Sequence, residues 1–132
     1  MPRKPSKLKK LQKECEDLMY EVAFRFYGKK CEICNASKDL IVHHFIPRKL
    51  CKSLIYELLN FVVLCKKCHF ELHKRQNPFI ILKIASKRGK KWIEYLETIF
   101  KEKRGTKSPS QLSFLSDAKS YLSALLRQGN KD

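Results

Sequence analysis

The chain has 132 residues, of which 43% are hydrophobic and 32% charged, so it is long enough for one modest core and does not have the composition of a disordered chain. It carries 29 Lys and Arg against 13 Asp and Glu, a net charge of +16. No apolar run approaches the roughly 20 residues of a membrane-spanning helix, and the basic first residues lead into no apolar signal-peptide core. We therefore expect a soluble, intracellular and cytoplasmic protein. Its charge predicts a polyanionic partner, with nucleic acid ahead of an anionic membrane surface.

Helix and strand patterns alternate along the first half of the chain. Apolar residues at helical spacing predict a helix over residues 8–27, and Gly28 follows where a C-cap is favoured. Two β-prone runs, residues 40–42 and residues 61–64, could each form one arm of a small antiparallel ribbon.

The second half of the chain has only helical patterns. Asn77 and Pro78 favour a helix start, and this helix is expected to have an apolar face of Phe79, Ile80, Leu82 and Ile84. Gly89 interrupts the pattern before a second helical stripe, in which we expect Trp92 to be a core residue. Residues 105–110 have the composition of a linker. Residues 111–128 return to helical spacing, and the apolar stripe over residues 111–126 is expected to be a dimer face or internal packing. Gly129 follows where this helix is expected to end.

These patterns divide the chain into four segments within one compact domain. Residues 1–28 are a basic leader and an N-terminal helix, and residues 29–77 contain all the histidines and the paired cysteines. Residues 78–104 are a basic helical extension, and residues 105–132 are a linker and a C-terminal helix. The paired cysteines and the histidines make residues 29–77 the expected functional core.

The six cysteines indicate metal binding, because a chain without an export signal does not suggest a disulfide framework. Four of them form two C-x-x-C pairs that suit one structural zinc site; they are Cys31, Cys34, Cys65 and Cys68. A Cys2His2 finger is excluded, because His69 directly follows Cys68 and leaves no residues to close such a fold. Cys15 fits the core side of the first helix, and Cys51 has no predicted role.

The histidines predict a second metal site. His69 and His73 lie four residues apart, on one face of a helix if Cys68 opens one. His43, at the end of the first β-prone run, is the natural third ligand. Three protein ligands leave coordination positions open, as in a catalytic metal site.

The residues between the first cysteine pair and His73 resemble the HNH endonucleases, a family of ββα-metal nucleases. The resemblance is carried by Cys31-Glu-Ile-Cys34, by Leu40-Ile-Val-His43-His44-Phe-Ile-Pro47 and by Asn60 through Cys65-Lys-Lys-Cys68-His69 to His73. The flanking helices look similar to those of small phage-type HNH proteins. The implied fold class is α+β, a small ββα-metal core with a structural zinc site, flanked by α-helices at both ends.

The resemblance also implies a role for each matching residue. His43, His69 and His73 match the ligands of a catalytic divalent ion, and His44 matches the general base that activates water. Asn60 matches the residue that holds the base-carrying loop. The four paired cysteines match structural Zn²⁺ ligands. Arg48, Lys49, Lys66 and Lys67 are expected nucleic-acid contacts, with a merely solvated charge as an equal alternative for each.

The implied activity is metal-dependent hydrolysis of DNA phosphodiester bonds, with the bound ion stabilising the transition state and the leaving group. Mg²⁺ or Mn²⁺ is the expected ion, although an all-imidazole site also suits Zn²⁺, Ni²⁺ or Co²⁺. The expected partner is DNA, bound mostly through its phosphates, with no membrane partner and with the protein acting as a monomer or a homodimer. The alternatives are a zinc-braced basic DNA-binding module that does not cut, and a nuclease of the same chemistry acting on RNA or branched DNA.

Overall fold

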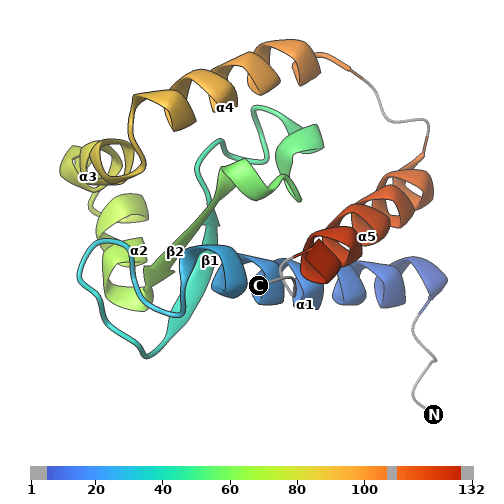
Figure 1. Ribbon diagram of the computed structural model, residues 1–132, viewed down its shortest axis with the longest axis horizontal. Helices are drawn as coiled ribbons and strands as arrows, with labels where there is room; N and C mark the ends of the chain where they lie inside the picture. Colours follow the sequence, from blue (N-terminus) through green and yellow to red (C-terminus); the bar gives the residue numbers. More distant parts are fainter. Residues whose placement is uncertain (1–5, 107–109, 129–132) are drawn as a thin grey trace.

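The computed structural model describes residues 6–106 and 110–128 and has an α+β fold, as predicted. A two-stranded antiparallel sheet lies at the centre, and helices from both ends of the chain pack around it (Figure 1). The helices and strands in chain order are α1 (Lys7–Tyr27), β1 (Leu40–His44), β2 (Phe61–Cys65), α2 (Lys66–His73), α3 (Pro78–Arg88), α4 (Lys90–Lys103) and α5 (Gln111–Gln128). Two short 3-10 turns, η1 (Lys52–Leu54) and η2 (Leu58–Asn60), lie in the loop between the strands.

Both faces of β2 are buried, and each face belongs to a different core. The strands pair with Leu40 opposite Cys65 and His44 opposite Phe61. Because successive side chains in a strand point to opposite faces, Phe61 and Val63 enter the core beside α1 and α5. Val62 and Leu64 enter a second core beside α3 and α4. The sheet therefore separates two helical layers.

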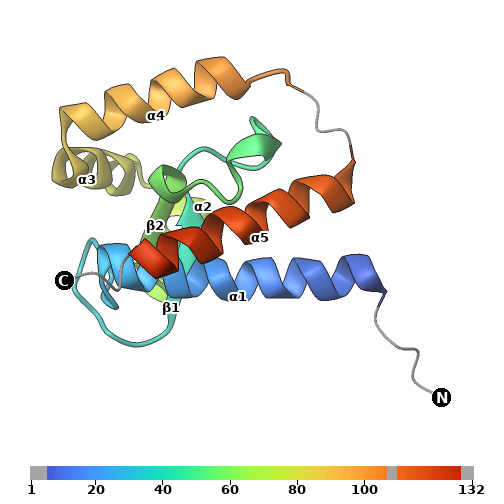
Figure 2. The same ribbon diagram turned by 45° about the vertical axis from the view of Figure 1, so that its right-hand side comes forward.

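The first layer is the pair α1 and α5, which lie side by side in Figures 1 and 2. The Ser6 side chain caps α1 by accepting a hydrogen bond from Lys9 N. The helix ends at Tyr27, and Gly28 caps it with a φ of 89°, which favours glycine. Cys15 is fully buried in this layer, as predicted for a core residue, and its thiol donates to the Leu115 carbonyl oxygen at 3.3 Å. The buried face of α5 consists of Leu115, Ala118 and Leu122. This face is internal packing, which was one of the two predictions for residues 111–128.

The second layer contains α2, α3 and α4, and one prediction for it was wrong. Asn77 caps α3 as expected, since its side chain accepts from Phe79 N. However, only Ile80 and Ile84 of the predicted apolar face are buried, whereas Phe79 is 63% and Leu82 60% exposed. Residues four apart share a helix face, and residues two apart do not, so the four residues could not all face one core.

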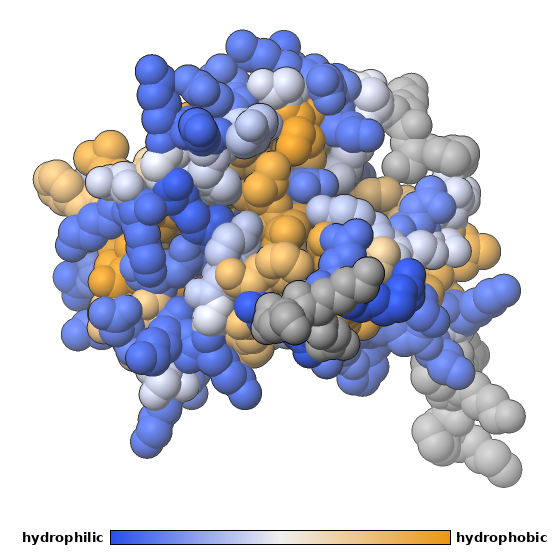
Figure 3. Space-filling view, viewed as in Figure 1, coloured by the Kyte–Doolittle hydropathy of each residue, from blue (hydrophilic) through white to orange (hydrophobic). Residues whose placement is uncertain are grey.

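Gly89 separates α3 from α4, and Trp92 is buried, both as predicted. Part of the predicted linker at residues 105–110, and the predicted helix end at Gly129, lie outside the described residues. Figure 3 shows hydrophobic side chains gathered in the middle of one face and again at its left edge, with hydrophilic ones between and around them. Within residues 6–106 and 110–128, no helix combines the length and apolar character needed to cross a membrane.

Candidate functional site

The four paired cysteines converge on one point beside the start of α2. Their sulfur atoms all lie within 4.8 Å of one another, and the Cys34 and Cys65 sulfurs are 3.5 Å apart. Zinc–sulfur bonds of about 2.3 Å at tetrahedral angles place sulfurs about 3.8 Å apart, so the cluster fits a zinc ion. Cys34 alone is exposed, while Cys31, Cys65 and Cys68 are buried. The arrangement suits a closed site in which all four ligands come from the protein.

Local structure sets the direction of these sulfurs. Helix α2 begins at Lys66, two residues before the start predicted at Cys68, because the Cys65 sulfur accepts from Cys68 N and caps the helix. Burial opposes ionisation of Cys31, but backbone hydrogen bonds from Cys34, Cys65 and Ile33 outweigh it and lower the pKa of the Cys31 thiol to about 7. Burial raises the pKa of Cys68. Ligation of all four sulfurs therefore requires a metal ion that displaces protons.

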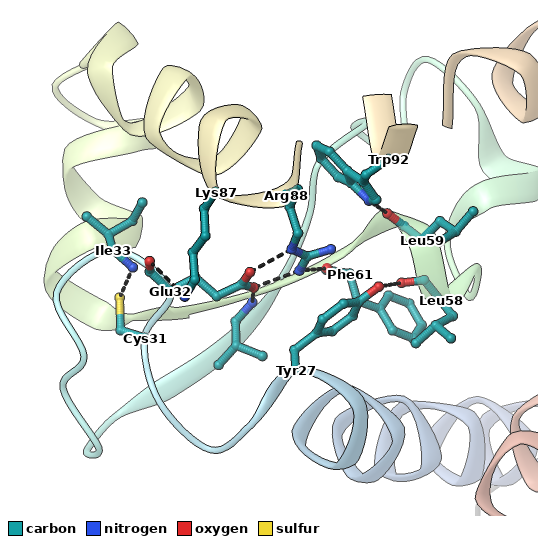
Figure 4. A network of polar contacts seen from close by, with 11 residues as sticks. Tyr27, Cys31, Glu32, Ile33, Leu58, Leu59, Phe61, Lys87, Arg88 and Trp92 are labelled. Atoms are coloured by element: carbon teal, nitrogen blue, oxygen red, sulfur yellow. Dashed lines mark hydrogen bonds and ion pairs between the residues drawn. The ribbon is translucent and has the colours of Figure 1, made fainter. Parts of the chain in front are cut away.

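A buried ion pair attaches the first cysteine pair to the helices. Arg88, the last residue of α3, donates from Nε and Nη2 to the two carboxylate oxygens of Glu32, both at 2.7 Å (Figure 4). Its Nη2 also donates to the Phe61 carbonyl oxygen at 2.7 Å. The guanidinium carbon lies 3.7 Å from the centre of the Tyr27 ring and 5.2 Å from that of Trp92. The pair thus joins α1, the first cysteine pair, β2 and α3.

Glu32 is held from the sheet as well, because Val63 N donates to its Oε2 at 2.8 Å. Trp92 Nε1 donates to the Leu59 carbonyl oxygen at 2.7 Å, which links α4 to the loop before β2. Sequence reasoning missed Glu32 and Arg88. They lie 56 positions apart, and the only signal was an acidic residue inside a C-x-x-C pair of a very basic chain.

The second cluster joins His43 of β1 to His69 and His73 of α2. Their ligand nitrogens all lie within 4.8 Å of one another, and His73 Nε2 is 3.3 Å from His43 Nδ1. Metal–nitrogen bonds of about 2.0–2.1 Å place tetrahedral ligands about 3.3 Å apart, so the spacing fits a divalent ion. His43 and His69 are half-buried, whereas His73 is exposed. The structure thus brings together the three histidines predicted as ligands, and their role stays a prediction.

The environment keeps the His43 and His69 rings neutral. Burial, followed by the nearby His73, His69 and His44 rings, lowers the pKa of His43 to about 3. Burial and His73 also lower the pKa of His69. Only a neutral imidazole can donate a lone pair to a metal, so His43 and His69 can accept a cation at neutral pH.

His44 is the last residue of β1, next to His43 but on the opposite face of the strand. Its ring meets that of Phe61 edge-on, with the ring centres 6.2 Å apart, and it donates a hydrogen bond to the Ile55 backbone. Its Nε2 is buried and has no hydrogen-bond partner among the residues that the structure describes. Burial lowers the pKa of His44, so this free nitrogen is a proton acceptor at pH 7.

Asn60 is fully buried and braces the loop that follows His44. Its Oδ1 accepts from Ile46 N at 2.6 Å, and its Nδ2 donates to the carbonyl oxygens of Ile46 and Leu54 at 3.1 and 3.0 Å. Every hydrogen-bonding atom of the amide side chain therefore has a backbone partner. The loop-holding role predicted for Asn60 accords with these contacts.

The four predicted nucleic-acid contacts are exposed but form two groups. Arg48 and Lys49 lie in the loop after His44, and Lys66 and Lys67 form the first turn of α2. Arg48 is close enough to His44 to lower its pKa. The structure thus places cationic side chains on the loop beside His44 and on the helix that carries His69 and His73.

A protein-family model matches the middle of the chain. The family model described as HNH endonuclease matches residues 31–75, about a third of the chain. Among curated proteins, the chain is 33% identical over 69 residues to a mitochondrial DNA mismatch repair protein mutS homolog of Sarcophyton glaucum. That match covers 49% of this chain and only 7% of the relative. The search of solved structures found no significant match.

The matched segment begins at Cys31 and ends two residues after His73, so it contains both clusters, both strands and α2. The family consists of metal-dependent nucleases that act on DNA. The α+β fold, the four-cysteine cluster and the histidine cluster are all compatible with that family. Residues 31–75 of this chain are thus similar to the HNH endonucleases, and both ligand clusters lie within them.

Proposed function

We propose that the chain is a metal-dependent endonuclease that hydrolyses DNA phosphodiester bonds at the end of β1. The observation that carries this proposal is the pairing of an open three-imidazole cluster with a buried, unpartnered His44 Nε2 at consecutive strand positions. The net charge of +16 favours a polyanionic substrate. The similarity to a DNA mismatch repair protein favours DNA over RNA.

In this mechanism His44 is the general base. The Ile55 backbone accepts the hydrogen bond from the ring and leaves Nε2 to take a proton from water. Because the pKa of His44 is lowered by burial, the ring is neutral and competent at pH 7. Asn60 keeps the loop, and with it the Ile55 carbonyl, in place through its contacts to Ile46 and Leu54.

His43, His69 and His73 would hold the catalytic ion. When bound there, a divalent ion supplies Lewis-acid stabilisation of the charge that develops on the phosphate and on the departing 3′ oxygen. Arg48 and Lys49 would orient the DNA backbone from the loop side, and Lys66 and Lys67 from α2. Cys31, Cys34, Cys65 and Cys68 would hold a zinc ion that takes no part in the chemistry.

The test is incubation of supercoiled plasmid with the purified full chain and added Mg²⁺, Mn²⁺, Ni²⁺ or Zn²⁺, beside His44→Ala. We expect nicking or linearisation that depends on the added ion and is lost in the variant at a temperature where circular dichroism shows that the variant is folded. Cleavage by His44→Ala at the wild-type rate would show that the general-base assignment is wrong. Salt-sensitive DNA binding without cleavage in any metal would instead favour a non-catalytic binding module.

A further inference from the structure

A cavity of about 390 Å³ lies on the α1 and α5 side of the loop between the strands. Ligand pockets in proteins commonly span roughly 300–1,000 Å³, so the cavity is large enough for a small ligand group. The loop contributes Arg48, Lys52, Ile55 and Tyr56, while α1 and α5 supply the remaining wall. None of the proposed metal ligands lines it.

The lining combines aromatic surface with positive charge. The Tyr56 and Phe114 rings form part of the wall, with their centres 6.0 Å apart and their planes inclined at 38°. Arg48 and Lys52 are exposed and supply the charge. Among the described residues that line the cavity, none is acidic. An aromatic wall beside two cations suits a planar ring that is attached to a phosphate, which is the chemistry of a nucleotide.

The cavity borders the proposed general base. Ile55 lines the cavity, and its backbone accepts the hydrogen bond from His44. Arg48 acts electrostatically on both His44 and Tyr56. His44 faces the α1 and α5 side of the sheet, which is also the side of the cavity. When a DNA strand is bound at His44, a nucleotide next to the bond at His44 can therefore reach this cavity.

A second, smaller cavity of about 240 Å³ limits what the first can hold. It shares Tyr56 and Phe114 with the first cavity, but Glu57 and Asp117 are among its lining residues. Carboxylates disfavour the approach of a second phosphate. The charge pattern therefore fits one nucleotide entering from the Arg48 and Lys52 side, with its base directed toward the aromatic wall.

We propose that this cavity takes one unstacked nucleobase of the substrate, while Arg48 and Lys52 contact the adjoining phosphate. This inference rests on the proposed function, because it adds a binding subsite next to the bond that the nuclease would cut. A base inside a regular duplex cannot enter such a cavity without leaving its stack. The protein therefore prefers DNA that offers an unpaired nucleotide beside the cleaved bond.

The test measures binding by fluorescence anisotropy, with the full chain and no added divalent metal. Two single-stranded probes are compared: an oligothymidylate, and an abasic oligomer with the same number of phosphates. The wild type should bind the base-bearing probe roughly 5- to 150-fold more tightly, the range expected for stacking one base on an aromatic side chain. Equal affinity for the two probes would overturn the proposal.

Two matched pairs of variants localise the effect. Phe114→Leu removes the ring from the cavity wall and should bring the affinity ratio close to one, whereas Phe79→Leu, an exposed ring on α3, should leave it unchanged. If Phe114→Leu is unfolded at the assay temperature, a second pair of variants is used. Gln111→Glu adds a carboxylate to the cavity lining, and its control, Gln128→Glu, makes the same charge change at the other end of α5. Gln111→Glu should weaken binding of the base-bearing probe more than Gln128→Glu does.

A ratio that survives in Phe114→Leu, or equal weakening of the base-bearing probe by Gln111→Glu and Gln128→Glu, would place base binding elsewhere and overturn the proposal. The outcome is separable from that of the proposed function, because the binding assay needs no cleavage. Plasmid cleavage together with a wild-type ratio of one would refute the base subsite and keep the nuclease. A base-dependent ratio lost in Phe114→Leu, without cleavage in any metal, would refute the nuclease and keep the nucleobase site as a binding site.

Discussion

The two ligand clusters share one strand pair and one helix, yet their surroundings differ. Three of the four cysteines are buried in the core beside α3 and α4, and the four together offer a full set of ligands for a tetrahedral ion. The three histidines are half-buried or exposed, and they leave coordination positions open. Polar contacts also brace the surroundings of each site, the Glu32–Arg88 pair beside the cysteines and Asn60 behind the loop that follows His44. A buried, closed site suits stability, whereas an open site suits a substrate.

The largest effect should come from loss of the closed site. In Cys65→Ser we expect the chain to lose its zinc and most of its stability, because structural zinc binding in small domains contributes about 10 kcal/mol or more to folding. Metal analysis and thermal unfolding measure both. Cys51→Ser is the matched control, a buried cysteine outside the cluster that should keep one zinc per chain. An unchanged melting temperature in Cys65→Ser would contradict a structural zinc.

Loss of one ligand from the open site should act on activity and leave the fold intact. In His73→Ala we expect cleavage to fall by about 10²-fold or more at a fixed metal concentration, because one of three ligands to the catalytic ion is removed. The exposed His73 packs into neither core, so the melting temperature of the protein without added divalent metal should stay within about 1 °C. Unaltered cleavage by this variant would remove His73 from the metal site.

Loss of the Glu32–Arg88 ion pair beside the cysteines should have the next largest effect, a loss of stability. Arg88→Met leaves the Glu32 carboxylate buried without its partner, which costs about 3–5 kcal/mol of the free energy of unfolding. The control, Lys101→Met, breaks an exposed pair with Glu97 on α4 and should change stability very little. Denaturant unfolding of both variants checks this prediction. Equal stabilities would mean that the buried pair does not hold the cysteine side to the helices.

Loss of Asn60, which holds the loop after His44, should reduce stability less than loss of the Glu32–Arg88 pair, and it should also affect the reaction. Asn60→Ala removes three hydrogen bonds to the loop backbone and should cost about 2–4 kcal/mol. At a temperature where the variant is folded, kcat should fall while KM changes little, since the loop also positions His44. A variant with reduced stability but normal kcat would make Asn60 a purely structural residue.

Local spacing explains why much of the site was predictable from the sequence. Two C-x-x-C pairs and a His-x3-His each bring ligands together within a single turn, so Cys31, Cys65 and His69 could be assigned before any tertiary structure was known. The helix over residues 8–27 and the two strands followed from periodicity for the same reason. These features depend on neighbours in the chain.

Other features depend on contacts between distant segments and could not be read from spacing. Glu32 and Arg88 are 56 positions apart, and the acidic residue inside a C-x-x-C pair does not indicate which basic residue pairs with it. Sequence analysis placed Phe79 and Leu82 in an apolar face, but the position of the core selects Ile80 and Ile84 instead. The cavity beside His44 likewise needs the meeting of α1, α5 and the loop. Only tertiary packing creates such surfaces.

The most direct test of two sites with different roles is a chelation experiment on a single sample. The protein is dialysed against a mild chelator, and its zinc content, melting temperature and plasmid cleavage are measured before and after Mg²⁺ or Mn²⁺ is restored. The predicted result is one retained zinc, an unchanged melting temperature, and cleavage that disappears and returns with the added ion. Cleavage that persists with only one zinc present, or that disappears together with the fold, would contradict separate structural and catalytic sites.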